Sequence, residues 1–235
     1  DPLWSRGLGD VYKRQKLLGL TATPGRTWSN ISEDERLSDF FDRQKVSLEI
    51  PGFNNPVEYL IQEKYLARPS FINLNINTGV QLTPEDIKQL SDDLEISQRI
   101  LDRLADDDQR TLAIIRRIEV LMTRHQRIAH AVKINSVLVA RGKLAACVTS
   151  DTPRLERDIA IRRFKSNNMN PMVLVNYGVL TTGFDAPSTS AAVICRPTKS
   201  LVLYSQMVGR ATRGPRAGGN ESCEIITVVD PGLPG

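Results

Sequence analysis

The sequence is poor in the features that build membrane-spanning, disulfide-bonded and metal-binding proteins. No apolar run approaches the ~18–20 residues of a membrane span, and no apolar segment suits a secretory signal. There are two histidines and three cysteines, and they form neither a CxxC pair nor a Cys/His cluster. We therefore expect no metal site, no membrane partner, and buried free thiols in a reducing, cytoplasmic compartment at Cys147, Cys195 and Cys223.

An excess of charge of one sign is also absent. The 31 basic side chains barely outnumber the 27 acidic ones, and a net charge of +4 says little about nucleic acid. Hydrophobic residues make up 40% of the chain, which is enough to bury the core of one large or two small domains.

What is present is a stretch from Met172 to Arg213 that has the pattern of an α/β protein. The apolar run Met172–Val175 predicts a strand buried on both faces, and Ala191–Cys195 predicts a second one. A helix predicted from about Ser200 would place three polar side chains, spaced i, i+4 and i+7, on one face: Gln206, Arg210 and Arg213. Two arginines and a glutamine beside a glycine suit a polyphosphate. The alternative is a solvated basic helix after an ordinary loop.

Two segments of this stretch carry a family resemblance. LTTGFDAP (180–187) and YSQMVGRATR (204–213) resemble motifs V and VI of superfamily-two DEAD/DEAH-box-type helicases. The region 40–76 resembles the corresponding part of helicases related to restriction-enzyme translocating subunits, and its residues 68–76 are expected to form a strand or an extended crossover into the second lobe. Upstream, KLLGLTATPGR (16–26) resembles motif III. The resemblance implies an α/β fold, with a RecA-like, mostly parallel sheet flanked by helices and a helical insertion.

The resemblance also implies a role for each matching residue. Arg213 would act as the arginine finger, which can be worth ~10³–10⁵ in rate, and Arg210 and Gln206 would support it. Contacts to ATP are expected at Gly183, Asp185 and Gly209. Contacts to nucleic acid are expected at Thr152, Thr181 and Thr182, and coupling between the two lobes at Thr21, Thr23 and Arg26. Thr152 has a second interpretation as the N-cap of a helix with Pro153 at its first position.

Two motifs of such helicases do not occur in the sequence. There is no GxxxxGK[ST] loop to cradle phosphates and no DEAH-like box to hold Mg²⁺. Both would precede TATP, so the ligands of Mg²⁺ are expected upstream of Lys16, and this chain alone is not expected to turn over ATP. Residues 1–15 include SRGLGDVYKRQ, which we interpret as a translated sequencing adapter, with a natural basic tail as the alternative.

The predicted domain organisation follows from these motifs. Residues 16–79 are expected to end the N-terminal lobe, residues 80–123 to form a helical insertion, and residues 124–235 to form the C-terminal RecA-like lobe. One helix is predicted over Thr83–Arg110, broken by the acidic residues 106–108, and a second over Leu112–Leu121. The strand expected after Arg127 is either very short or missing, so no residue is assigned to motif IV.

The predicted function is that of one part of an ATP-dependent nucleic-acid helicase or translocase, with DNA favoured over RNA. Two alternatives remain open. One is a duplex-DNA translocase in a restriction, repair or remodelling complex that pumps DNA without unwinding it. The other is a non-catalytic nucleic-acid-binding fragment.

Overall fold

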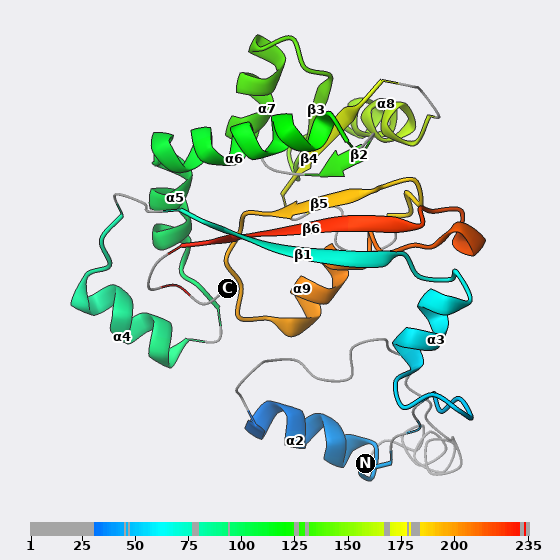
Figure 1. Ribbon diagram of the computed structural model, residues 1–235. Helices are drawn as coiled ribbons and strands as arrows, with labels where there is room; N and C mark the ends of the chain where they lie inside the picture. Colours follow the sequence, from blue (N-terminus) through cyan, green and yellow to red (C-terminus); the bar gives the residue numbers. More distant parts are fainter. Residues whose placement is uncertain are drawn as a thin grey trace, which may run out of the picture.

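The computed structural model describes residues 31–44, 46, 48–76, 80–93, 95–124, 127–129, 132–166, 170–177, 179, 184–230 and 233. Its centre is a sheet of six strands in the order β1-β6-β5-β2-β4-β3, in which every pair of neighbours is parallel (Figure 1). The strands are β1 (Arg68–Asn75), β2 (Arg127–Ala129), β3 (Ala145–Val148), β4 (Met172–Asn176), β5 (Ala191–Ile194) and β6 (Ser222–Val229). The predicted α/β class is confirmed.

Helices cover both faces of this sheet. In chain order they are α2 (Ile31–Phe40), α3 (Pro56–Gln62), α4 (Pro84–Asp92), α5 (Gln98–Asp106), α6 (Asp108–Met122), α7 (Val132–Ala140), α8 (Arg154–Lys165) and α9 (Leu201–Val208). Figure 1 shows α6 and α7 on one side of the sheet and α9 on the other. The strand β4 shows why both faces need cover, because its first four residues are all buried. Val173 packs with α6 and α7, and Leu174 packs with α8.

The helices before β2 differ from the prediction in one respect. A single helix over Thr83–Arg110 is wrong, because the chain between α4 and α5 is extended at Asp93 and Ser97. The break lets α5 bury Ile100 and Leu104 in a small cluster of their own. The predicted cap at Thr83 and the predicted break at residues 106–108 are both confirmed, since Asp107 caps α6.

The apolar spacing predicts inward faces at Leu112, Ile115, Ile118 and Met122 in α6 and at Leu155, Ile159 and Phe164 in α8, and the structure buries these faces only in part. In α6, Ile115 and Ile118 are buried as expected, but Leu112 is 38% exposed. In α8, Phe164 is buried whereas Leu155 is 69% exposed and does not face the sheet. Both helices contact the sheet along a narrower stripe than their apolar residues suggest, because α6 and α8 each leave one side to solvent.

The strand expected after Arg127 is present but short. β2 has three residues and lies at the centre of the sheet, between β4 and β5. The interpretation of a very short strand therefore holds. The neighbouring positions 125, 126, 130 and 131 lie outside the described residues.

A lobe boundary at residue 124 would cut through one hydrophobic core. β1 pairs with β6 over eight residues, from Arg68↔Ser222 to Asn75↔Val229. Ile118 of α6 is fully buried in the same cluster as strands β4, β5 and β6. The segment at 68–75, expected as a strand or a crossover into the second lobe, is thus an edge strand of the lobe itself. The local sequence around β1 does not reveal that β6 is its partner, because β6 lies more than 150 residues away.

A buried ion pair fixes α6 to the carboxyl ends of β5 and β6. Arg110 donates to Asp230 through Nε (2.7 Å) and Nη2 (2.8 Å), and Nη2 also donates to the carbonyl of Cys195 (2.5 Å). The two side chains are 7% and 1% exposed. Removing one partner would leave the other charge buried without compensation.

We predict that Asp230→Asn lowers the free energy of unfolding by about 3–5 kcal/mol, because a buried arginine loses its counter-charge. The matched control is Glu119→Gln, which breaks the more exposed pair between Glu119 and Arg141 and should cost less than about 1 kcal/mol. Urea unfolding of both variants measures the difference. Equal effects of the two changes would show that the buried pair does not hold α6 in place.

Candidate functional site

The candidate site lies where the order of the strands reverses. After β4 the chain crosses β2 and enters β5 on its other side, so residues 177–190 form the crossing segment. All strands are parallel, so their carboxyl ends meet at one edge, and open α/β sheets bind ligands at such reversal points. Asp185 belongs to the later part of this crossing segment, which runs from the carboxyl end of β4 to the amino end of β5.

The helix α9 is shorter than predicted. It ends at Val208, Gly209 caps its carboxyl end by donating to the Ser205 carbonyl, and Arg210 lies in the following turn. Arg213 lies further on, in an isolated bridge with Leu66. The prediction that Gln206, Arg210 and Arg213 share one helical face is therefore wrong. Glycine favours ending a helix at this point, and a backbone pairing with a distant segment then holds the chain extended.

Arg213 and Asp185 nevertheless come together. The Nη1 atom of Arg213 forms an ion pair with Oδ1 of Asp185, and the two side chains are 33% and 65% exposed. The sequence assigned these residues to one site through two separate roles, and the fold joins them directly. An ion pair this exposed adds little to stability, so both groups stay available to a ligand.

Arg210 precedes Arg213 by three residues and contacts Phe184, the chain neighbour of Asp185. Its guanidinium lies over the ring of Phe184, 5.4 Å from the centroid, and burial lowers the pKa of this group. Within the described residues its Nη1 atom is buried and has no hydrogen-bond partner. A buried charged donor without an acceptor is costly, and an anion at this edge would supply the acceptor.

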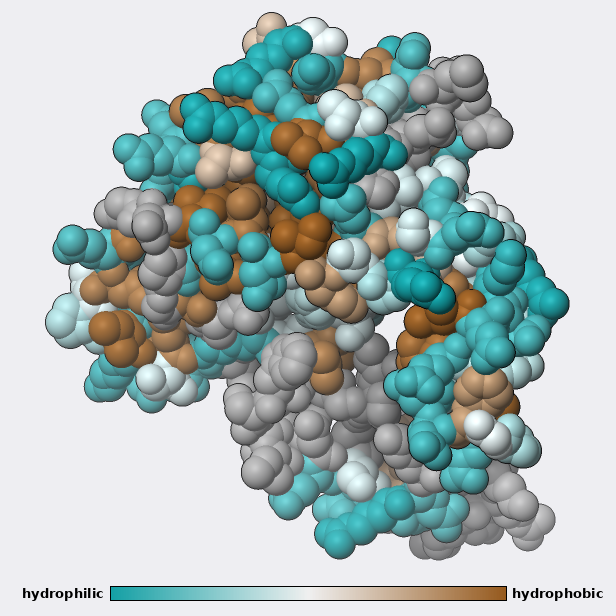
Figure 2. Space-filling model, in the orientation of Figure 1, coloured by the Kyte–Doolittle hydropathy of each residue, from teal (hydrophilic) through white to brown (hydrophobic). Residues whose placement is uncertain are grey.

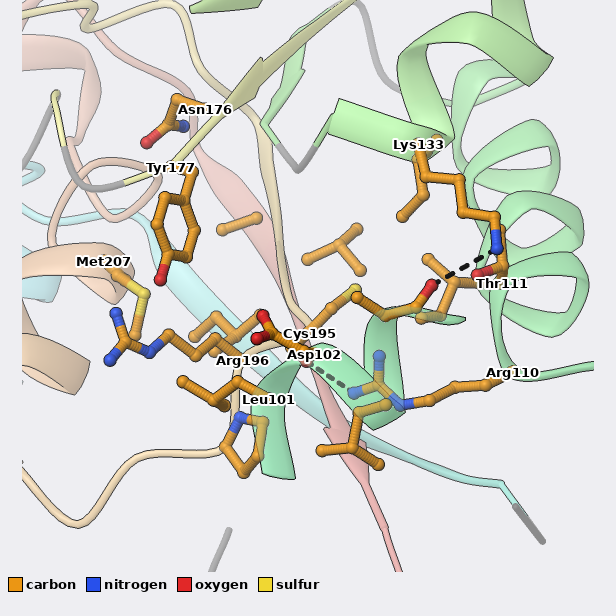
Figure 3. Close-up of a pocket in the computed structure, with 18 of the residues that line it drawn as sticks. Leu101, Asp102, Arg110, Thr111, Lys133, Asn176, Tyr177, Cys195, Arg196 and Met207 are labelled. Atoms are coloured by element: carbon orange, nitrogen blue, oxygen red, sulfur yellow. Dashed lines mark hydrogen bonds between the residues drawn. The ribbon is translucent and has the colours of Figure 1, made fainter. Parts of the chain in front are cut away.

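A pocket of about 570 Å³ opens next to Arg210. Arg210 and Gln206 form part of its wall, together with the ends of β4 and β5 and residues of α5, α6, α7 and α9, whereas Asp185 and Arg213 do not line it. Figure 2 shows hydrophobic residues around α5 and beside α6 on the face in view. Figure 3 shows Arg110 reaching toward Cys195 and Tyr177 lying on the other side of the pocket.

Among the residues at this pocket that were not predicted, Tyr177, Gln98 and Arg196 contact one another. The Tyr177 hydroxyl donates to Oε1 of Gln98 (3.2 Å), and the guanidinium of Arg196 lies over the Tyr177 ring at 5.6 Å. Tyr177 directly follows β4 and Arg196 follows β5 by two residues. Their position at strand ends is the signal in the sequence that could have found two of them.

The start of α9 is held by α4. Lys199 donates from Nζ to the carbonyls of Leu90 and Asp93, the latter at 2.7 Å, which satisfies groups at the carboxyl end of α4. Ser200 then caps α9 by accepting from the amide of Leu203 (3.2 Å). The placement of α9 therefore depends on the placement of α4.

A buried carboxylate in turn fixes α4. Asp86 is fully buried and accepts from the Thr83 amide (2.9 Å), from Arg99, and from Nη1 of Arg103 (2.8 Å). The hydrogen bond from the Thr83 backbone, followed by those from the two arginines, holds the pKa of Asp86 well below its ordinary value, against the opposing effect of burial.

Thr152 does not cap α8. The helix begins at Arg154, and Pro153, at its N-cap, makes no side-chain cap hydrogen bond. The hydroxyl of Thr152 instead accepts from the backbone amide of Thr149 (2.8 Å) and closes a turn after β3. This corrects the N-cap interpretation, and a contact of Thr152 with nucleic acid stays a prediction.

Six predicted residues lie outside the described residues. They are Gly183, Thr181 and Thr182 of the crossing segment, and Thr21, Thr23 and Arg26 of the segment resembling motif III. The adapter-like residues 1–15 lie outside them as well.

Metal and thiol chemistry can be stated for the described part of the chain. No group of three or more His, Cys, Asp or Glu side chains there could hold a metal ion, so we assign none of these residues to Mg²⁺. Among the described helices, none is long and apolar enough to cross a bilayer. Cys195 and Cys223 are buried and free, as predicted, and burial raises the pKa of the Cys223 thiol to about 11. Cys147 is only partly buried.

The structure thus combines a parallel sheet, covered by helices on both faces, with an aspartate and two arginines in the segments before β5 and after α9. The family model described as the helicase conserved C-terminal domain matches residues 95–215, just over half of the chain. The chain therefore belongs to this family, as the C-terminal lobe of a superfamily-two helicase.

Two curated relatives share this sequence in part. IRC3 of Saccharomyces cerevisiae, which is named as an ATP-dependent helicase, is 28% identical over 181 residues, covering 72% of this chain and 24% of IRC3. The type I restriction enzyme EcoKI endonuclease subunit of Escherichia coli K12 is 36% identical over 85 residues, covering 35% of this chain and 7% of the subunit. The chain thus spans about a quarter or less of the length of these relatives.

Solved structures of similar shape include two helicase-related proteins. The ATP-dependent Type ISP restriction-modification enzyme LlaBIII bound to DNA has a TM-score of 0.48 and 16% identity, covering 73% of this chain and 12% of that one. The C-terminal domain of the DEAD-box protein Dbp5 has a TM-score of 0.41 and 21% identity, covering 52% of this chain and 71% of that one.

We predict that Asp86→Asn destabilises the protein at pH 7 but has little effect in acid. Because the folded pKa of Asp86 is lowered, its contribution is complete above the unfolded value of about 3.9 and is lost as the pH falls below it. The difference in the free energy of unfolding between the two proteins should stay constant from pH 7 to about pH 4 and then narrow steadily down to pH 2, because it disappears fully only at the lowered folded pKa. A constant gap across this range would contradict the prediction.

We further predict that Asp185→Ala and Arg213→Ala each change the free energy of unfolding by less than about 1 kcal/mol, because their ion pair is exposed. Thermal melts at low and at high salt measure this. A larger loss would mean that the pair maintains the fold, and that a loss of activity in these variants could not be assigned to the site.

Proposed function

We propose that this chain provides the C-terminal lobe of an ATP-dependent nucleic-acid helicase or translocase. ATP, with Mg²⁺ held by another part of the protein, would bind between this lobe and a second one that carries the phosphate-binding loop. The observation that carries the proposal is the buried Nη1 of Arg210, which has no partner among the described residues, on a residue that precedes the ion-paired Arg213 by three positions. A polyphosphate bound next to these side chains would accept a hydrogen bond from Arg210 and would compete with Asp185 for Arg213.

We assign the roles that the resemblance to motifs V and VI implies. Asp185 would accept from the ribose of the nucleotide, and Arg210 and Gln206 would contact phosphate oxygens. Arg213 would leave Asp185 and stabilise the charge on the transferring phosphoryl group. This exchange is favourable, because the pair that opens is exposed and weak while a guanidinium binds phosphate through two parallel hydrogen bonds.

The remaining predicted residues complete the proposal. Gly183 and Gly209 would let the nucleotide approach the backbone closely. Thr152, Thr181 and Thr182 would bind the phosphates of a nucleic-acid strand. Such contacts do not depend on base sequence, as movement along a strand requires. Lobe closure would be coupled to the strand through three residues: Thr21, Thr23 and Arg26.

A duplex-DNA translocase of a restriction complex is the second candidate. The relationship to the EcoKI endonuclease subunit, 36% identical over 85 residues, favours it and favours DNA over RNA. The two candidates differ in what happens to the duplex. Displacement of a labelled strand indicates unwinding, whereas displacement of a third strand from a triplex without unwinding indicates translocation alone.

We predict that the gene product carrying this segment with a phosphate-binding loop hydrolyses ATP faster when nucleic acid is added. Arg213→Ala should lower kcat by ~10³–10⁵, because the transition state loses its counter-charge, while ATP still binds. Steady-state ATPase assays and equilibrium binding of a fluorescent ATP analogue measure the two effects.

The matched control for this prediction is Arg141→Ala. Arg141 has an exposed fraction of 42%, close to the 33% of Arg213, and it also pairs with a carboxylate, but it lies at the end of α7. Its removal should leave kcat unchanged. The motor function would be refuted by an intact protein that hydrolyses no ATP on any DNA or RNA, which would favour the non-catalytic binding fragment.

A further inference from the structure

The loop that carries Arg213 is held by a segment that lies about 150 positions earlier in the sequence. Residues 64–67 lie between α3 and β1, and they run antiparallel to residues 212–216. Three backbone hydrogen bonds join the two segments. Ala67 donates to Thr212 (2.9 Å), Gly214 donates to Tyr65 (2.9 Å), and Arg216 donates to Lys64 (3.0 Å). Figure 1 shows the start of β1 next to the loop after α9.

Gly214 makes this close pairing possible, and Gly219 lets the loop fold back closely onto the backbone of Arg213. A Cβ atom at Gly214 would lie 2.7 Å from the carbonyl carbon of Lys64 and 2.8 Å from that of Leu66. A Cβ atom at Gly219 would lie 2.6 Å from the carbonyl carbon of Arg213. The backbone of Gly214 is in an ordinary extended conformation (φ −84°, ψ 173°), so an alanine there is opposed by contact alone and not by its dihedral angles.

The side chains around this pairing form a looser outer layer. Lys64 pairs with Glu221 at 3.4 Å, and Arg216 pairs with Glu63 at 3.0 Å. All four side chains are more than a third exposed, so these pairs add little. The position of the loop therefore depends on the backbone contacts and on the two glycines.

We propose that residues 64–67 act as a clamp that positions Arg213, with Gly214 and Gly219 as its positioning residues. The segment enters the lobe from α3 and leads directly into β1, so a displacement of the incoming chain moves the backbone on both sides of Arg213. The clamp gives the lobe a second route of coupling, separate from the one proposed for Thr21, Thr23 and Arg26. This inference rests on the proposed role of Arg213 in ATP hydrolysis.

The experiment compares Gly214→Ala and Gly219→Ala in the intact, ATP-hydrolysing gene product. Displacing a catalytic group by about 1 Å can cost 10²-fold in rate, so kcat should fall about 10²-fold in both variants. The KM for ATP should change less than about threefold, because Asp185 and Arg210 are untouched. Glu221→Ala is the matched control, since it removes the outer ion pair with Lys64 but leaves residues 64–67 unchanged, and its kcat should stay within about twofold of the wild type.

Hydrogen exchange of backbone amides provides a readout that does not depend on activity. In the wild type, the amides of Ala67, Gly214 and Arg216 should be protected. In the two glycine variants they should exchange quickly, while the amides of β6 stay protected. Fast exchange of the three amides in the wild type would overturn the clamp.

The outcomes separate this inference from the proposed function. Wild-type kcat in both glycine variants, with Arg213→Ala inactive, would refute the clamp and leave the role of Arg213 intact. Full activity of Arg213→Ala would refute that role, and the clamp with it. Loss of protection in β6 of either variant would show that the glycines maintain the fold instead of positioning Arg213, which would also overturn the proposal.

Discussion

The parallel pairing of β1 with β6 is the constraint on which the rest of the site depends. It joins residues 68–75 to residues 222–229, and so it fixes where the chain enters the lobe. The residues just before β1 then lie beside the loop after α9, which sets the course of the backbone at Arg213. A contact between two strands that are distant in sequence thus determines the position of a side chain belonging to neither.

The site combines rigid and exchangeable contacts. Arg110 and Asp230 are buried and bind each other through two hydrogen bonds, so they are suited to holding α6 in one position. Arg213 and Asp185 are exposed and joined by a single ion pair, so they can exchange partners at low cost. The buried arginine–aspartate pair, Arg110 with Asp230, therefore stabilises the fold. The exposed pair, Arg213 with Asp185, can open for a ligand, and the difference in burial accounts for this.

Local sequence patterns predicted the local structure well. The apolar run at Met172, the cap at Thr83 and the break before α6 were all predicted from neighbouring residues, and all are present. The end of α9 was missed, because the chain after Gly209 is held by residues about 150 positions earlier. The partner of β1 and the ion pair of Arg213 with Asp185 were missed for the same reason. The motifs assigned Asp185 and Arg213 to one site but could not show that the two side chains touch.

The short central strand β2 makes few backbone pairings with its two neighbours in the sheet. In the described part of the chain, β2 pairs three residues with β4 and two with β5, whereas β1 and β6 pair eight. The sheet thus consists of two groups of strands, β1-β6-β5 and β4-β3, which the short strand β2 joins through few paired residues. The segment that carries Asp185 connects β4 of one group with β5 of the other, and Arg213 lies between β5 and β6 in the sequence. A small rotation of one group of strands relative to the other would change the distance between the side chains of Asp185 and Arg213, while the strand pairing within each group stays intact.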